Sequence, residues 1–240
     1  MIRVPLGELR EGEVALDGAS YRYVVRVHRL RAGDAFVAFD PGCRLEARAE
    51  LVQVRREVAR VRLGKPRPAT LVAARSLTLV QAAVKGSKLN GILRGATELG
   101  ATGVVVAVAS RSVKRPPDGR MVQRLGRIAV EAARQCGRGD APAVIGPEPL
   151  AEALAAHAVA PDAGAALCLD PGANLPLAAT LADVGEQTPI VLVIGPEGGL
   201  TADELDAAAH HGYQRVSLGR FVLRTETAAL AALGAVASRG

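Results

Sequence analysis

The fold of this protein is decided by residues 194–200, Ile194-Gly195-Pro196-Glu197-Gly198-Gly199-Leu200. A run of branched apolar residues, Ile190–Ile194, precedes this stretch, and Thr201 and Glu204 after it have the spacing of a helix capping box. An apolar run that passes through glycines into a helix is typical of a buried strand in a parallel α/β sheet. Ligands bind at the carboxyl ends of such strands, where glycines let backbone amides approach closely. The stretch therefore predicts a ligand-binding loop; the alternative is a tight turn without a ligand.

Two further glycine turns follow predicted strands of the same sheet. One is Leu169-Asp170-Pro171-Gly172, and the other lies in Leu218-Gly219-Arg220-Phe221-Val222-Leu223-Arg224-Thr225-Glu226-Thr227-Ala228. The 194–200 loop has neither the pattern G-x-G-x-x-G nor a phosphate-binding Gly-Lys-Ser/Thr, which disfavours nicotinamide dinucleotides and nucleoside triphosphates as ligands. Turns at one edge of a sheet can enclose an adenosine, with the apolar Ile194, Leu218 and Leu223 around its base.

The chain from residue 69 onward alternates between strand and helix patterns, which predicts a parallel sheet with helices on both faces. Periodicity alone indicates an ordinary doubly wound sheet. The expected strands are Leu77–Ala83, Val104–Ala109, Ala165–Leu169 and Ile190–Ile194. The expected helices are Ser87–Leu99, Met121–Cys136, Ala202–His211 and Glu226–Ser238.

The first 68 residues have a different pattern, of short strands separated by turns. Lys65-Pro66-Arg67-Pro68 ends this pattern with prolines that cannot donate to a sheet ladder, so we expect a linker there and a domain boundary after residue 68. The first domain is expected to be a small antiparallel barrel or sandwich. Its strands are expected at Tyr21–Val27, Ala35–Phe39, Leu45–Val54 and Val58–Leu63.

The charge is distributed very unevenly along the chain. Residues 1–140 contain 26 Lys and Arg against 13 Asp and Glu, whereas residues 141–240 contain 4 against 11. Clustered arginines neutralise phosphates, so a nucleic acid is the expected partner of the first part, although an Arg-rich surface can also merely keep a protein soluble. The phosphate contacts are assigned to Arg22, Arg26, Arg29 and Arg31, with a solvated strand face as the alternative.

The remaining composition limits the class of protein. The longest apolar run is only as long as a strand, and the N-terminus has no apolar signal region, so we expect a cytoplasmic protein without a membrane span. Cys43, Cys136 and Cys168 have no C-x-x-C spacing and no neighbouring histidines, which argues against disulfides and against a bound metal.

These segments together resemble the RsmE group of small-subunit ribosomal RNA uridine N3 methyltransferases, in the SPOUT class. The resemblance lies mainly in the 194–204 loop and the 218–230 segment. It is supported by Thr97-Glu98-Leu99-Gly100, by Arg111 and by Gln135-Cys136-Gly137-Arg138. The basic N-terminal segment is a looser match to the PUA-like β-barrel of that family.

The resemblance implies both the fold and the activity. It implies residues 1–68 as an RNA-binding PUA-like barrel and residues 69–240 as a SPOUT methyltransferase domain with a deep trefoil knot. It also implies S-adenosylmethionine as the cofactor, 16S ribosomal RNA or the small subunit as the substrate, and a homodimer. The alanine-rich last helix suits such a dimer, and packing within the chain explains it equally well. The cofactor is assigned to Leu169, Ile194, Gly195, Pro196, Glu197, Gly199, Leu218, Gly219, Leu223 and Thr227.

The proposed reaction needs positive charge, because uracil N3 must lose a proton as it is methylated and negative charge spreads onto the carbonyl oxygens. Arg111, Arg138 and Arg224 match arginines of the family's motifs and are assigned to this role. Glu98 or Glu197 is a candidate proton acceptor if burial raises its pKa; the alternative for each is a cap or a loop contact. This chain lacks the acidic residue at two positions of the motifs: it has Ala109-Ser110-Arg111 where relatives have Ser-Glu-Arg, and Arg134-Gln135-Cys136 where they have Glu-Gln-Cys. The rival functions are methylation of a ribose 2′-hydroxyl or of guanine, and a non-catalytic ribosome assembly factor.

Overall fold

The computed structural model describes residues 1–112 and 118–239, and these form two compact units. The first unit contains Met1–Val72 together with Val130–Ala141, and the second contains the rest of the chain. Helix α3 (Gly119–Cys136) is therefore divided between them. The sequence did not indicate that this helix is divided between the units, because an amphipathic pattern does not reveal which core each end of a helix packs against.

The first unit is built on a sheet in which neighbouring strands follow the order β1-β3-β4-β5-β2. β1 pairs in parallel with β3, and the other pairs in this order are antiparallel. In β5, apolar side chains alternate with exposed arginines, so one face of the sheet packs onto a core containing Phe36, Leu51 and Val61. The strands are β1 (Arg3–Pro5), β2 (Gly12–Leu16), β3 (Ala35–Asp40), β4 (Leu45–Val54), β5 (Ala59–Leu63) and β6 (Arg67–Pro68).

The predicted strand over Tyr21–Val27 is wrong. This segment is helical, with α1 (Gly18–Tyr21) followed by a π-helix, η1 (Arg22–Val27). Its β-branched and aromatic residues favour a strand locally, but Tyr21 and Val24, three positions apart, are both buried in the core. The burial of these two residues on one side of a helix outweighs the local preference of the segment for a strand.

The predicted linker over residues 65–68 is only partly correct, because its second half belongs to the sheet. β6 pairs with β4 in antiparallel fashion, at the edge of the sheet where a proline is tolerated. The buried Glu46 fixes this segment by accepting hydrogen bonds from Arg67 (2.9 Å) and Arg3 (3.1 Å).

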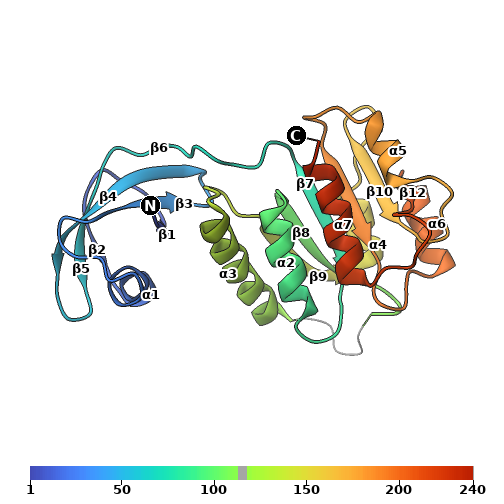
Figure 1. Cartoon of the computed structure of the whole chain (residues 1–240). Coiled ribbons are helices and arrows are strands. Elements are labelled where there is room, and N and C mark those ends of the chain that lie inside the picture. Colours follow the sequence, from blue (N-terminus) through green and yellow to red (C-terminus); the bar gives the residue numbers. More distant parts are fainter. Residues whose placement is uncertain (113–117, 240) are drawn as a thin grey trace. The chain divides into compact units, whose positions relative to one another are not determined.

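The second unit contains the predicted parallel sheet, in the order β12-β10-β11-β7-β8-β9 (Figure 1). The predicted strands and helices of this part are confirmed, with small shifts at their ends; β9, α4 and α5 were not predicted, and β12 was expected only as a strand ending before Gly219, without bounds. The strands are β7 (Leu77–Ala82), β8 (Gly103–Val108), β9 (Ala143–Pro149), β10 (Ala165–Leu169), β11 (Ile190–Ile194) and β12 (Gln214–Val216). Its other helices are α2 (Lys88–Glu98), α4 (Leu150–Ala156), α5 (Leu177–Ala182), α6 (Ala202–His210) and α7 (Thr225–Ala237).

Both faces of this sheet are covered. Alternate residues of the central strands enter two separate cores, so Ile190, Leu192 and Ile194 face one side and Val191 and Val193 the other. The first core is closed by α2, α5, α7 and the start of α3, and the second by α4 and α6. The continuous apolar strands predicted this arrangement. It leaves the carboxyl edge of the sheet free for the loops that follow β10, β11 and β12.

Candidate active site

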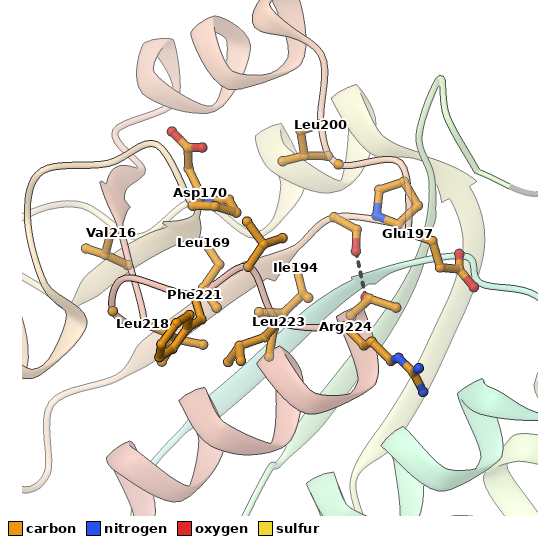
Figure 2. A pocket seen from close by; sticks show the side chains of 18 of the residues that line it. Leu169, Asp170, Ile194, Glu197, Leu200, Val216, Leu218, Phe221, Leu223 and Arg224 are labelled. Atoms are coloured by element: carbon orange, nitrogen blue, oxygen red, sulfur yellow. Dashed lines mark hydrogen bonds between the residues drawn. The ribbon is translucent and has the colours of Figure 1, made fainter.

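A cavity of about 400 Å³ opens at the carboxyl edge of the parallel sheet. The loops that follow β10 and β11, and the segment between β12 and α7, form its walls. Apolar side chains, among them Leu218, Phe221 and Leu223, gather at one end, and Glu197 and Arg224 lie at the other (Figure 2). Such a cavity offers an apolar compartment for a ring system and a charged end for a polar group.

The structure brings the predicted cofactor residues together, with one exception. Of the ten, all except Thr227 line the cavity. Thr227 is exposed on the first turn of α7. The lining also includes residues that were not assigned to the cofactor from the sequence: Asp170, Pro171, Leu200, Leu205, Val216, Phe221, Val222, Arg224, Thr225 and Ala228.

A buried polar bridge fixes two of the cavity walls to the central strand β7. The Thr225 hydroxyl donates to the Gly195 carbonyl (2.7 Å; dashed in Figure 2) and accepts from the Gln81 side-chain amide (3.2 Å). Gln81 and Thr225 are 0% and 6% exposed, so each bond lies away from water. Gln81 was not predicted from the sequence, although a polar residue within the apolar run of β7 was an available signal.

A second bridge is electrostatic and links the same loops to α2. The Lys88 ammonium lies 3.2 Å from a carboxylate oxygen of Glu197 and 3.2 Å from one of Glu226. Burial pushes the pKa of Glu197 up, but its own backbone amide and Lys88 more than offset this and hold the pKa below its usual value. The condition under which Glu197 would accept the proton, a pKa raised by burial, is therefore not met, and the alternative of a loop contact agrees with its bond to the Lys85 amide (3.3 Å). Glu98, the other candidate acceptor, is exposed on α2 and does not line the cavity.

Asp170 lines the cavity at the loop after β10, and local donors hold its carboxylate. Its carboxylate accepts from the Gly172 amide (2.9 Å) and from Arg215 Nε (2.9 Å). Burial pushes the pKa of Asp170 up, but the Gly172 amide and Arg215 together lower it below its ordinary value. Asp170 is therefore an anion that holds the loop after β10 to β12.

The predicted capping box at the start of α6 is confirmed, and it also holds the loop that carries Arg111. Glu204 accepts from the Thr201 amide (2.8 Å) and from the Ser110 amide (2.7 Å). Arg111 in turn donates to the Gly198 carbonyl (3.0 Å). A side chain at Gly198 would stand 3.2 Å from Arg111 Cβ, so the glycine gives this arginine room beside the 195–200 loop.

The three predicted catalytic arginines have different surroundings. Arg111 is exposed and bound to the loop after β11, and Arg224 is exposed where it lines the cavity at the start of α7. Arg138 is 5% exposed and donates through Nε to Asp140 (2.9 Å) in the first unit. It does not line the cavity, unlike Arg224.

The four arginines predicted to bind RNA all lie in the first unit and are exposed. Arg22 and Arg26 stand four residues apart on η1, and Arg29 and Arg31 follow it. Within the described ranges, none of these side chains forms an ion pair. They stand on a helical segment and the turn after it, where the sequence predicted a strand face.

Neither a metal centre nor a membrane span is found among the described residues. No group of three or more His, Cys, Asp and Glu side chains could hold a metal ion in the part of the chain that the structure describes. Among the helices it describes, none has the length and apolar character needed to cross a bilayer.

Comparisons with known proteins agree with this geometry. The family model of the RNA methyltransferase domain matches residues 73–237. Ribosomal RNA small subunit methyltransferase E from Synechocystis sp. is 34% identical over 229 residues, covering 95% of this chain and 74% of that protein. The crystal structure of ribosomal RNA small subunit methyltransferase E from Neisseria gonorrhoeae bound to S-adenosyl methionine is 29% identical, with a TM-score of 0.85 over 98% of this chain and 96% of that one. A methyltransferase from Legionella pneumophila, solved with its bound cofactor SAM, is 26% identical, with a TM-score of 0.84 over 99% and 97% of the two chains.

The family match covers the whole parallel sheet and the cavity at its edge. The chain belongs to the RNA methyltransferase domain family and, through its curated relatives, to the ribosomal RNA small subunit methyltransferase E group within it.

Proposed function

We propose that this protein transfers the methyl group of S-adenosylmethionine to N3 of a uridine in small-subunit (16S) ribosomal RNA. The observation that carries the proposal is the cavity in which three loops of the sheet edge meet, one of them the 195–200 loop. The similar structure from Neisseria gonorrhoeae is bound to S-adenosyl methionine, and the curated relatives are named for ribosomal RNA of the small subunit.

The residues present fit this cofactor. The 195–199 loop and Leu218-Gly219 line the cavity and would bind its polar atoms through their backbone, and Ile194, Leu223 and Leu169 would hold the adenine. When bound, S-adenosylmethionine supplies an electrophilic methyl group. The Glu197 carboxylate, kept ionised by Lys88, places negative charge at the end of the cavity where a cationic group of the cofactor is favoured.

The arginines at this edge act on the base. Arg111 and Arg224 stabilise the negative charge that develops on the uracil oxygens as the N3 proton leaves, because guanidinium groups donate strong charge-assisted hydrogen bonds. Arg138, whose charge is matched by Asp140 two residues away, has a structural role within residues 130–141 in this scheme.

The remaining features of the proposal rest on the resemblance of the motifs. The second unit is a SPOUT domain in which the loops after β10, β11 and β12 belong to a deep trefoil knot. Residues 1–68 form a PUA-like barrel that binds RNA through Arg22, Arg26, Arg29 and Arg31. The protein acts as a cytoplasmic homodimer.

The proposal is tested by single-turnover methylation with the Arg111→Ala variant. We expect turnover to be lost while the Kd for S-adenosylmethionine, from calorimetric titration, stays near that of the wild type. Arg111→Lys retains the charge and should keep part of the rate. Unchanged turnover in Arg111→Ala would remove Arg111 from the mechanism.

The product identifies the target atom. Mass spectrometry of nucleosides from the methylated RNA should yield N3-methyluridine. A 2′-O-methylated nucleoside or a methylguanosine would show that the enzyme methylates a ribose hydroxyl or a guanine instead. If the wild type failed to bind S-adenosylmethionine, the protein would be a non-catalytic RNA-binding factor.

A further inference from the structure

A second basic surface lies on α2 and α3, outside the cavity and within the second unit. It consists of Arg94 on α2 and Arg120, Arg124 and Arg127 on α3, all of them exposed. The three on α3 are separated by four and three residues, so they share one side of the helix. We call these four residues the α2–α3 arginine face.

The charge of this face is not neutralised by the protein. In the ranges that the structure describes, none of its four arginines forms an ion pair, whereas Arg62, for example, lies 3.1 Å from Glu13. Arg124 is instead held by uncharged atoms, donating to Asn90 Oδ1 (3.1 Å) and to Met121 Sδ (3.0 Å). Its guanidinium is therefore oriented while its charge stays available.

The stability of α3 does not explain these arginines. Like charges four residues apart repel each other, and Arg120 stands in the first turn, where the helix dipole disfavours a cation. The first turn contains no acidic residue, although Asp118 just before it accepts from the Met121 amide (2.8 Å). The nearest carboxylates along the helix, Asp118 and Glu131, lie only at the two ends of the stripe.

The arginine face begins close to the cavity. Lys88, in the first turn of α2, holds the cavity residue Glu197. Asn90, in the same turn, accepts the hydrogen bond from Arg124. Residues two positions apart point to different sides of a helix, so the first turn of α2 contacts the cavity wall on one side and the arginine face on another.

We propose that the α2–α3 arginine face binds the phosphates of the RNA strand that flanks the methylated nucleotide. This inference rests on the proposed function, because it takes RNA as the substrate. Guanidinium groups match phosphate oxygens with two parallel hydrogen bonds. α2 and α3 carry no aromatic residue on which a base could stack, so the contacts are to the backbone and not to bases.

The test compares RNA binding by the Arg120→Gln/Arg124→Gln/Arg127→Gln variant and the wild type at several salt concentrations, using a fluorescently labelled fragment of small-subunit ribosomal RNA. Glutamine preserves helix propensity. We expect affinity to fall about tenfold or more at low salt, and the slope of log K against log salt to decrease by about 1 for each phosphate that the variant no longer binds. The Kd for S-adenosylmethionine and the turnover at saturating RNA should not change.

Matched variants separate charge from folding and from general electrostatics. The Arg10→Gln/Arg60→Gln/Arg62→Gln variant removes the same charge from arginines that lie within 4 Å of a carboxylate, and it should lose little affinity. Replacing the three α3 arginines with lysine should preserve most of the salt slope. The double variant Arg120→Gln/Arg127→Gln keeps the hydrogen bonds of Arg124 and should still bind RNA more weakly than the wild type.

Three outcomes would overturn the inference. The triple variant could keep the salt slope of the wild type, or the Arg10/Arg60/Arg62 control could lose as much affinity as the triple variant. The third is that the triple variant no longer forms dimers in sedimentation while its affinity for RNA is unchanged. Failure of the proposed function would be distinguishable from these, since it would show in the wild type as absent cofactor binding or a different methylated nucleoside.

Discussion

Thr225 connects the two halves of the cavity wall through a single hydroxyl. Its bonds to the Gly195 carbonyl and the Gln81 amide are buried, so Thr225→Val, which preserves the shape of the side chain, removes the donor to the Gly195 carbonyl and leaves the Gln81 amide only its bond to the Ala82 carbonyl (3.0 Å). We expect a loss of about 1–3 kcal/mol in unfolding free energy, measured by urea denaturation, together with weaker binding of S-adenosylmethionine. Thr225→Ser retains the hydroxyl and should restore both. Wild-type stability in the valine variant would show that the bridge contributes nothing.

The charge of Asp170 should make the stability of the protein depend on pH. Its folded-state pKa lies below the ordinary value, so its contribution to stability is present above about pH 4, the unfolded pKa, and is lost as pH falls through the lower folded pKa. Asp170→Asn should cost about 1–2 kcal/mol at pH 7, because the bond to Arg215 is charge-assisted and partly exposed. Thermal unfolding of both proteins from pH 7 to pH 3 should show the difference shrinking in acid. If the difference in stability between the two proteins does not change with pH, the charge of Asp170 is not its cause.

For single residues, the sequence predicted where they lie in the fold better than which other residues they contact. The glycine turn at Gly195 follows an apolar strand and the one at Gly219 precedes a helix start, so their place at the sheet edge could be predicted, and both glycines line the cavity. The lowered pKa of Glu197 could not be predicted, because Lys88 lies far from it in the sequence and contacts it only in the folded protein. Gln81 and Thr225 likewise become partners only when β7 and α7 are packed together.

The capping box of α6 does more than begin a helix, since Glu204 also holds the Ser110 amide next to Arg111. Thr201→Ala should cost about 1 kcal/mol, the usual value for removal of a cap, and leave turnover nearly unchanged. Glu204→Ala should cost more stability and should also lower turnover, because it releases the loop that carries Arg111. Denaturation and single-turnover rates of the two variants make the comparison; equal turnover in both would show that the Ser110 contact does not position Arg111.

The elements that could be predicted are those whose pattern agrees with their burial. β10 and β11 are short apolar runs between turns, and their observed bounds are those expected from the sequence. The helical segment around Tyr21–Val27 was missed because its β-branched residues favour a strand, whereas the core accepts Tyr21 and Val24 from one side of a helix. β12 has only three residues, so the sequence indicated a strand end before Gly219 but not the bounds of the strand.

For the chain as a whole, the parallel sheet of the second unit could be predicted, but the parallel β1–β3 pair of the first sheet and the division of α3 between the units could not. The alternation of apolar strands and amphipathic helices is sufficient to predict the parallel sheet. The sharing of α3 depends on contacts such as Arg134, whose guanidinium stacks 3.7 Å above the Tyr23 ring in the first unit. That contact joins residues more than 100 positions apart, and no local pattern encodes it.

The division into two units also predicts how the cofactor stabilises the protein. All the residues that line the cavity belong to the second unit, so the binding energy of S-adenosylmethionine should stabilise that unit directly. At a concentration 100 times its Kd, a ligand that binds only the folded state adds about 2.7 kcal/mol. Hydrogen exchange with and without S-adenosylmethionine should therefore show increased protection in residues 195–200 and 218–224, with little change in β4 and β5. The Thr225→Val variant, with its weaker binding, should show a smaller increase at the same concentration. Protection of equal size in β4 and β5 would mean that the units unfold together, and unchanged protection in both cavity segments would place the cofactor elsewhere.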